Sequence, residues 1–237
     1  MSLLELHSVS KRFGGLVANQ DVSFTVDAAQ IVGLIGPNGA GKTTAFNCVA
    51  GYYAPSAGHI TLDGRMISGL PPEACARAGV GRTFQVARTF TSMTAGENVF
   101  AASLLHHKRL PAARVEALRW LTFMGLEHLA ERRAGSLTIS EQRRMAVARA
   151  LATEPKVLLM DEVMAGLNPS EVREMVAVVL KIRARGIACL IVEHVLEGIM
   201  PIADKIVVLD RGLKIADGTP ADVSSNAAVI SAYLGDE

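Results

Sequence analysis

The chain has 237 residues, half of them hydrophobic, so it is long enough to bury a sizeable core. Its 24 Lys and Arg residues nearly balance its 23 Asp and Glu residues, and the net charge of +1 gives no indication of nucleic-acid binding. No apolar run approaches the ~18 residues that span a bilayer. The sequence also has neither a signal-peptide pattern nor a CxxC pair. We therefore expect a cytosolic protein that reaches a membrane only through a partner.

The N-terminal third of the chain is expected to form short strands separated by turns, over residues 3–13, 22–36 and 58–64. Alternation in the last of these segments, followed by glycine, predicts a hairpin arm. From about residue 72 to residue 137 the pattern becomes helical. It is clearest over residues 111–135, where Leu118, Leu121 and Leu126 lie on or near one face.

The last hundred residues alternate between strand and helix. Apolar strands are expected at residues 156–161, 187–194 and 205–210, and an amphipathic helix at residues 170–185 ends at a glycine. Continuous apolar strands alternating with helices predict a mainly parallel α/β sheet that is covered on both faces. We therefore expect one domain over residues 1–237, with residues 86–150 or so forming an inserted helical subdomain.

The strongest motif follows a buried strand at residues 31–35. Residues 36–43 match the pattern GxxxxGK[ST], and a helix follows. Glycines let backbone N–H groups curl around phosphates, lysine reaches the β- and γ-phosphates, and the Thr43 hydroxyl is a ligand for Mg²⁺. A glycine-rich turn that binds nothing would not require every motif position to be filled. The ATP-contacting residues expected here are Gly36, Pro37, Asn38, Gly39, Ala40, Gly41, Lys42, Thr43 and Thr44.

Two further strands end in groups that suit phosphate chemistry. Asp161 and Glu162 follow an apolar run, where the aspartate suits Mg²⁺ and the glutamate could polarise an attacking water. The alternative is that both acids merely face solvent at the end of the strand. His194 follows the next apolar strand, and although a lone histidine is usually structural, open α/β sheets bind ligands at this edge.

The motifs occur in a recognisable order. The chain resembles an ATP-binding cassette (ABC) transporter ATPase subunit over essentially its whole length. The motifs that carry the resemblance are, in order, the phosphate loop, the glutamine in GRTFQ, the segment LTISEQRRMAVARAL, and then VLLMDE, AGLNP and EH. The wording of GRTFQVARTFTSMTAGENV, MAGLNPSE and the ending AYLG is similar to the ATPase subunits of branched-chain amino acid importers. RTFQ and VEHV resemble one of the two paired ATPases in such importers.

This resemblance implies a P-loop NTPase fold, ATP hydrolysis that drives transport, and a role for several residues. Phe13 would stack on adenine, unless it is an ordinary core phenylalanine. Gln85 would touch Mg²⁺ and water, unless it is only a polar residue at a strand end. Asp161 would bind the metal, Glu162 would be the catalytic base, and His194 would contact the γ-phosphate.

The resemblance also implies an assembly. Such ATPases work as head-to-tail dimers, in which each ATP lies between one subunit's phosphate loop and the other's signature segment. A loop comprising Gly166, Leu167 and Asn168 would cross the dimer interface. The expected partners are a second ABC ATPase, two membrane permease subunits at the inner face of the cell membrane and, indirectly, a periplasmic or extracellular solute-binding protein. The helical subdomain would receive coupling helices from the permeases.

The signature segment departs from the family's usual LSGGQ. Thr138 and Glu141 are spaced as a capping box, whereas Ile139 and Ser140 replace two glycines that permit close approach to a phosphate. If Glu141 turned inward, its charge would repel the nucleotide by roughly 4 kcal/mol at 4 Å and an effective dielectric of about 20. We expect weakened ATP binding at the partner's site, an intact phosphate loop in this chain and therefore an asymmetric heterodimer.

Several alternatives are open at this stage. A similar ATPase could serve another cargo, such as a different solute or a lipid, because nothing in this chain would contact cargo. Non-transport ABC ATPases of DNA repair or translation usually carry a second cassette or a long coiled coil, which this sequence lacks. A regulatory cassette could bind ATP without hydrolysing it. A P-loop kinase or GTPase would not explain Gln85, the signature helix and His194 together.

Overall fold

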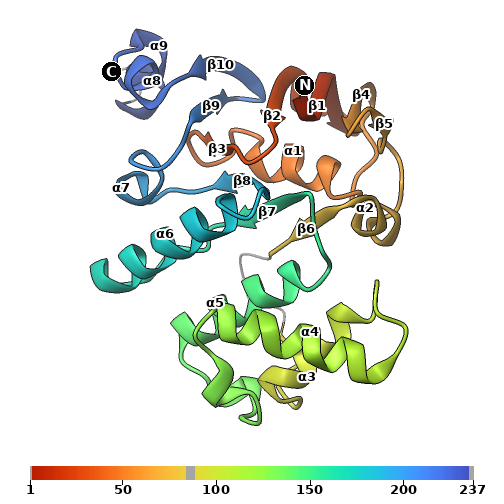
Figure 1. Ribbon diagram of the computed structural model, residues 1–237. Coiled ribbons are helices and arrows are strands. Elements are labelled where there is room, and N and C mark those ends of the chain that lie inside the picture. Colours follow the sequence, from red (N-terminus) through yellow and green to blue (C-terminus); the bar gives the residue numbers. More distant parts are fainter. Residues whose placement is uncertain (1, 84–88, 235–237) are drawn as a thin grey trace.

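A computed structural model describes residues 2–83 and 89–234 of the chain, and within these ranges the strands form two sheets (Figure 1). The larger sheet has six strands in the order β10-β9-β3-β8-β7-β6. All of its neighbouring pairs are parallel except β9 and β10. Its strands are β3 (Ile31–Ile35), β6 (Val80–Arg82), β7 (Val157–Asp161), β8 (Ala188–Val192), β9 (Lys205–Asp210) and β10 (Leu213–Gly218).

The central strands are buried on both faces, as their continuous apolar sequences predict. Because successive side chains of a strand point to opposite faces, each strand contributes to two cores. Ile31 and Ile35 of β3 belong to the core on the side of the long helices. Val32 and Leu34 belong to the other core, together with Phe46 of helix α1 (Lys42–Val49).

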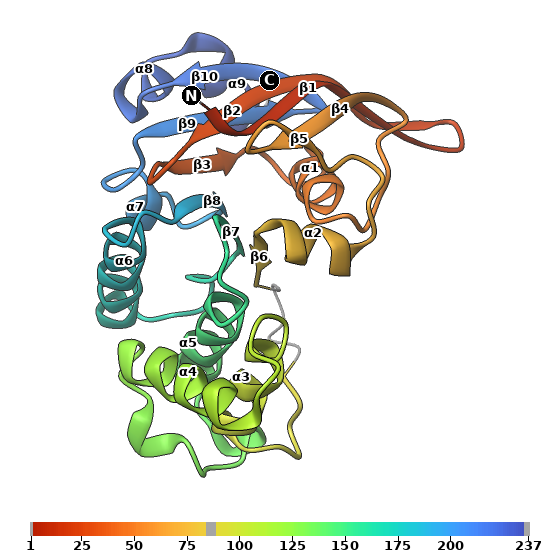
Figure 2. The same cartoon turned by 45° about the vertical axis from the view of Figure 1, so that its right-hand side comes forward.

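The second sheet is antiparallel and has the order β2-β1-β4-β5. It comprises β1 (Ser2–Phe13), β2 (Leu16–Asp27), β4 (Ala57–Leu62) and β5 (Arg65–Met66). In Figure 2 this sheet lies at the top of the view, and α1 and the large sheet lie between it and the helices at the bottom. The expected antiparallel arm and its hairpin are therefore confirmed, and so is the mainly parallel core sheet.

Helices α3 (Ala95–Ser103), α4 (Leu110–Phe123) and α5 (Ile139–Leu151) pack on one another at the end of the molecule opposite the antiparallel sheet (Figures 1 and 2). Short 3₁₀ turns at Glu127–Leu129 and Ala134–Ser136 connect α4 with α5. The capping box expected at the start of α5 is confirmed, because the Glu141 carboxylate accepts the Thr138 N–H at 2.8 Å and the Thr138 hydroxyl accepts the Glu141 N–H at 3.3 Å.

The remaining helices cover the sheets or connect their strands. Helix α6 (Pro169–Arg183) follows β7, and α7 (Leu196–Ile199) follows β8, on the same side of the large sheet (Figure 2). Helices α8 (Pro220–Ser224) and α9 (Ala227–Leu234) follow β10 at the sheet edge. Helix α2 (Pro72–Ala78) precedes β6.

Two expectations about the middle of the chain are wrong. The helical pattern from residue 72 is interrupted by β6, which pairs with β7 after Gly79 ends α2 at a φ of 113°. Helix α4 ends at Phe123, because Gly125 adopts a φ of 69°, so Leu126 lies beyond the helix. Leu121 and Leu126 are both buried in the core, whereas Leu118 is 44% exposed.

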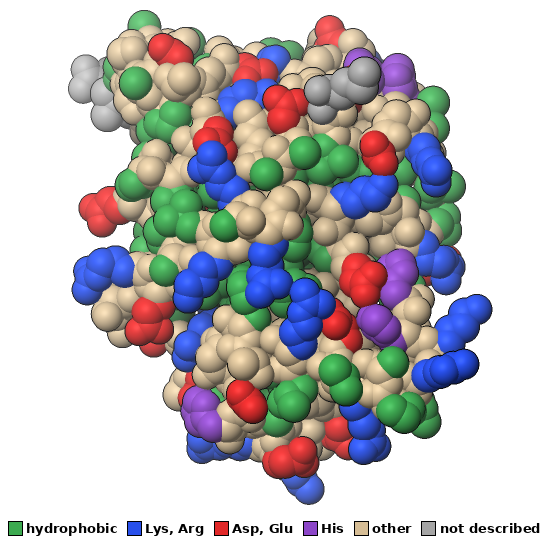
Figure 3. Space-filling view, in the orientation of Figure 1, with side chains coloured by type: hydrophobic (Ala, Val, Ile, Leu, Met, Phe, Trp, Pro, Cys, Tyr) green, Lys and Arg blue, Asp and Glu red, His purple; other side chains and the backbone are tan. Residues whose placement is uncertain are grey.

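Charged side chains of both signs are spread over the face drawn in Figure 3. Over residues 2–83 and 89–234, the structure contains no helix with the length and hydrophobicity of a membrane span.

Candidate nucleotide site

A cavity of about 570 Å³ opens where the carboxyl ends of β3, β7 and β8 meet. This is the edge at which open α/β sheets bind ligands. The cavity brings together most of the residues expected to bind or hydrolyse ATP, from segments that lie far apart in the sequence. Its lining residues are Phe13, Leu16, Val17, Ala18, Asn38, Gly39, Ala40, Gly41, Lys42, Thr43, Thr44, Glu162, His194 and Arg211.

The phosphate loop needs its glycines at two positions. Gly36 has a φ of 146°, and a Cβ atom there would overlap the carbonyl oxygen of Leu209. Gly41 has a φ of 96°, and its Cβ would overlap the carbonyl oxygen of Ala18. Since side chains are excluded by both backbone angle and space, the loop can curl into the start of α1 only with glycine at these positions.

Lys42 is folded back over this loop. Its Nζ donates hydrogen bonds to the carbonyl oxygens of Gly36 at 2.7 Å and Pro37 at 2.8 Å. Burial lowers the pKa of Lys42, while the Glu162 and Asp161 carboxylates nearby raise it. The ammonium group is therefore held at the cavity wall close to two acids, in the place where it would meet phosphate oxygens.

Asp161 ends β7 and is only 4% exposed. Its backbone N–H donates to the Thr83 hydroxyl at 3.2 Å, and an oxygen of its carboxylate lies 3.6 Å from Arg82 Nη2. Burial raises the pKa of this carboxyl group, whereas Arg82 lowers it. Asp161 is thus a buried carboxylate that pairs with Arg82 and lies close to Lys42 of the phosphate loop. Carboxylate and hydroxyl oxygens, such as those of Asp161 and Thr43, are the hard donors that fit Mg²⁺.

Glu162 and His194 lie side by side in the lining of the cavity. The Glu162 Oε1 atom lies 3.2 Å from Nε2 of His194. Glu162 has a φ of 50°, which is uncommon for a residue with a side chain. Its backbone is fixed on both sides, because its N–H donates to the Val192 carbonyl at 2.9 Å and its own carbonyl accepts Nη1 of Arg143 at 2.7 Å. The strained backbone turns the carboxylate toward His194, two residues beyond the end of the neighbouring strand β8.

Phe13 lies at the rim of the cavity and is 41% exposed, so it is not a core phenylalanine. Its ring meets the edge of Tyr53 at 5.1 Å between centroids, and Lys11 Nζ lies 5.0 Å from the Phe13 centroid. A partly exposed aromatic face at this point is available for stacking on a planar ligand.

The signature segment lies apart from these residues, and the described part of it does not line the cavity. Ile139 is 65% exposed and Ser140 is buried. The pKa of Glu141 is lowered, mainly because its carboxylate accepts a hydrogen bond from the Thr138 backbone N–H. The carboxylate is thus engaged in its own helix cap rather than extended into solvent.

The loop expected to cross the dimer interface also lies outside the cavity lining. Gly166 adopts a φ of 71°, and Asn168 begins α6. The Asn168 side chain accepts hydrogen bonds from the backbone N–H groups of Ser170 at 2.9 Å and Glu171 at 3.1 Å. Asn168 therefore fixes the end of the loop as a helix cap.

Gln85, the remaining expected metal ligand, lies outside the described residues. Three residues that the sequence analysis gave no role contact the site directly: Arg82 beside Asp161, Arg143 on the Glu162 carbonyl, and Glu193, which is buried next to His194. A signal for Glu193 was present, since an acid directly after an apolar strand requires a partner. Nothing in the helical pattern of α5 distinguished Arg143 from its neighbours.

Comparisons with known proteins agree with this geometry. A family model described as "ABC transporter" matches residues 19–165, and one described as "Branched-chain amino acid ATP-binding cassette transporter" matches residues 214–237. The chain is 43% identical to the high-affinity branched-chain amino acid transport ATP-binding protein BraF of Pseudomonas aeruginosa, with 99% of the chain and 98% of that protein covered. It is 40% identical to LivG of Escherichia coli K12, with the same coverage.

Solved structures show the same similarity. A nucleotide-free ATP-binding cassette from an ABC transporter matches with a TM-score of 0.91 and 30% identity, and both chains are covered completely. An ATP-binding cassette in its ADP conformation matches with a TM-score of 0.90 and 31% identity, again over the whole of both chains. With more than half of its length matched by the family model and full-length relatives above 30% identity, the chain belongs to the ABC transporter family, as one of its ATP-binding cassettes.

Proposed function

We propose that this cassette is the ATP-hydrolysing subunit of an importer for branched-chain amino acids. The observation that carries the proposal is the single cavity in which the phosphate loop with Lys42 faces the pair Glu162 and His194. The names of the full-length relatives and the match of residues 214–237 support the cargo class.

In this proposal Lys42 binds the β- and γ-phosphates, and the loop amides and the start of α1 hold the remaining phosphate oxygens. Thr43 and Asp161 would hold Mg²⁺, with Gln85 as a third contact. The ion supplies charge neutralisation at the phosphates when it is bound. Phe13 stacks on the adenine at the rim.

Glu162 then acts on the attacking water. Its carboxylate accepts a water proton as general base, and His194, at 3.2 Å, orients the carboxylate and contacts the γ-phosphate. The rigid backbone around Glu162 keeps the base in place, which matters because small displacements of catalytic groups reduce rates strongly.

Replacement of the phosphate-loop lysine tests the binding site. We expect Lys42→Ala to weaken Mg-ATP binding by about tenfold or more, because a charge-assisted hydrogen bond contributes ~1.5–3 kcal/mol. Isothermal titration calorimetry on the full chain measures this. Lys214→Ala, on β10 away from the cavity, is the control. An unchanged dissociation constant for K42A would refute the assignment of this cavity as the ATP site.

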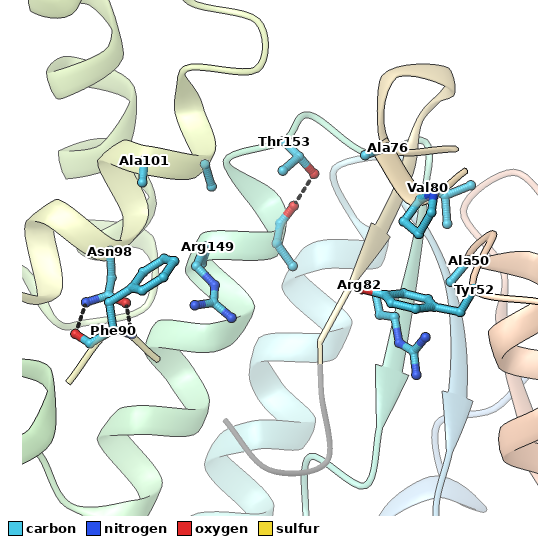
Figure 4. Close-up of a pocket in the computed structure, with 13 residues that line it drawn as sticks. Ala50, Tyr52, Ala76, Val80, Arg82, Phe90, Asn98, Ala101, Arg149 and Thr153 are labelled. Carbon is cyan, nitrogen blue, oxygen red and sulfur yellow. Dashed lines mark hydrogen bonds between the residues drawn. The ribbon is translucent and has the colours of Figure 1, made fainter. Parts of the chain in front are cut away.

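Membrane subunits are proposed to dock in a second cavity, of about 490 Å³, between β6 and the helices α3 and α5 (Figure 4). Phe90 and Asn98 line one side of it and Tyr52 and Arg82 the other. Phe90 is 55% exposed and Tyr52 is 46% exposed, so the cavity offers aromatic surface to a short helix. This docking would hold the cassette at the inner face of the cell membrane, with residues 86–150 as the receiving subdomain.

The dimer is proposed to be asymmetric. This chain's own phosphate loop, Glu162 and His194 are complete, whereas its signature segment presents exposed Ile139 and an already capped helix start. We infer that a second, different ATPase subunit supplies the signature for this chain's ATP. The site completed by residues 138–141 then hydrolyses ATP more slowly.

The signature can be tested within the assembled complex. In a Glu162→Gln background the residual turnover comes from the partner's phosphate loop, which residues 138–141 complete. We expect Ile139→Gly with Ser140→Gly to raise that residual turnover several-fold, since glycine permits closer approach of the backbone to phosphate.

Ala221→Gly is the control for this test, because Ala221 is the second residue after the capping threonine of α8, as Ser140 is in α5. It should leave turnover unchanged. A double glycine variant with no higher residual turnover than its parent would contradict the proposed role of the signature.

The cargo needs its own experiment, because the chain is also 35% identical to the lipopolysaccharide export protein LptB of Haemophilus influenzae over 100% of its length. Deletion of the coding sequence should abolish uptake of radiolabelled leucine, isoleucine and valine at micromolar concentration. Normal uptake together with a lipid-export defect would favour the second cargo class.

A further inference from the structure

Glu193 is a buried acid that the proposed mechanism does not use. It follows β8 and has no exposed surface. Its Oε1 accepts the backbone N–H of Met164 at 2.7 Å, while Oε2 has no hydrogen-bond partner among the described residues. Burial raises the pKa of Glu193 to about 7, although the N–H groups of Met164, Val195 and His194 lower it.

The contacts of Glu193 join two loops that the sequence separates by about thirty residues. Met164 lies in the loop 162–168, between Glu162 and Gly166, and His194 is the next residue after Glu193. The Met164 side chain is fully buried and packs against Gly198 of α7. Two contacts therefore join the 162–168 loop to the segment that begins at His194. One is the packing of the Met164 side chain against Gly198, and the other is the hydrogen bond from the Met164 N–H to Glu193.

Stability alone does not account for this residue. A buried carboxylate with an unpartnered oxygen destabilises the folded state, whereas an apolar residue of similar size would fill the same space without that cost. Residues that break a local rule in this way occur mainly at functional sites.

We propose that Glu193 is a positioning residue that makes His194 and the loop 162–168 one rigid unit. Movement of the loop at the dimer interface then moves His194 with it and sets its distance to the γ-phosphate. This inference rests on the roles proposed for His194 and for the 162–168 loop.

Hydrogen exchange on the full chain without nucleotide tests the connection independently of activity. We expect Glu193→Ala to speed amide exchange about tenfold or more in peptides covering both 162–168 and 193–199, and to leave peptides over 36–49 unchanged. Glu193→Gln keeps an oxygen for the Met164 N–H and should retain most of the protection.

Asp204→Ala is the matched control, because Asp204 also binds a backbone N–H, that of Ile31 at 2.8 Å, but at the opposite end of β3. It should speed exchange near residue 31 and near Arg183, with which Asp204 also pairs at 2.9 Å, but not in peptides over 162–168 or 193–199. If E193A leaves one of the two loops as protected as in the wild type, the loops are not one unit and the proposal is overturned.

A double-mutant cycle for Mg-ATP hydrolysis gives the second readout. We expect E193A to lower kcat about tenfold with less than about a twofold change in ATP affinity, and to have almost no further effect in a His194→Ala background. Equal fold losses in both backgrounds would show that Glu193 does not act through His194. A wild-type rate for His194→Ala alone would instead count against the proposed role of the histidine, while the exchange data still decide whether the loops are joined.

Discussion

Glu162→Gln is expected to reduce Mg-ATP turnover of the assembled complex by about a hundredfold, because general bases contribute roughly 10²–10⁴ in rate. The glutamine amide is nearly the same size as the carboxylate and can stay within hydrogen-bonding distance of His194, which lies 3.2 Å from the Glu162 carboxylate. The amide cannot accept a water proton. ATP binding should be preserved, since Lys42 and the loop are untouched. Turnover is measured by phosphate release at saturating ATP.

Glu174→Gln is the control, because this glutamate lies exposed on α6 with its nearest cation, Arg144, at 4.0 Å. It should hydrolyse ATP at the wild-type rate. The equivalent glutamine substitution in the second ATPase subunit should leave most of the turnover, because in the proposed dimer that subunit's ATP site is completed by the altered signature of this chain. Equal losses from the two substitutions would exclude the asymmetry, and full activity of E162Q would exclude Glu162 as the base.

Glu193→Gln is expected to change how stability depends on pH. The folded pKa of Glu193 is about 7 and its ordinary value is 4.5, so between these values the folded state holds a proton that the unfolded state has released. The stabilisation from this proton is complete below pH 4.5 and is lost as the pH rises through about 7. At about 1.4 kcal/mol per pKa unit, the wild type loses roughly 3 kcal/mol of unfolding free energy across this window.

Glutamine does not titrate, so the E193Q variant lacks this loss. The unfolding free energy of the variant relative to wild type should therefore rise by roughly 3 kcal/mol between pH 4.5 and pH 8. Urea unfolding at several pH values measures this difference. Glu131→Gln, an exposed acid, should show no such trend. Parallel curves for wild type and E193Q would mean that Glu193 ionises in the folded state as easily as in the unfolded chain.

Much of the fold could be predicted because its strands are continuous apolar runs and its turns carry glycine. Residues 31–35 were identified as a strand with the bounds that the structure has, and the strand expected at 156–161 begins one residue later, at Val157. Strand β6 was missed because its sequence, Val-Gly-Arg, has neither length nor alternation, and its pairing with β7 is a tertiary event. The end of α4 was missed because the apolar pattern continues past Gly125.

The candidate site was predicted to a similar degree. The phosphate loop, Glu162 and His194 are brought to one cavity by the ends of parallel strands, and the sequence marks those ends. The supports behind them follow from backbone contacts instead. No spacing rule predicts that Arg143 of α5 reaches the Glu162 carbonyl, or that Glu193 accepts the Met164 N–H. Such contacts depend on how the helices pack on the sheet.

Arg82 has a consequence for how transport and hydrolysis are linked. The same side chain lines the cavity between β6 and the helices α3 and α5, and lies 3.6 Å from the Asp161 carboxylate. Both groups are nearly shielded from water, at 11% and 5% side-chain exposure, so dissolved salt screens their attraction little. A membrane helix that shifts this guanidinium group by an ångström would directly change the electric field at the carboxylate that we propose to bind Mg²⁺. Signalling between the membrane and the nucleotide would then need no long chain of intermediates, and it should persist at high ionic strength.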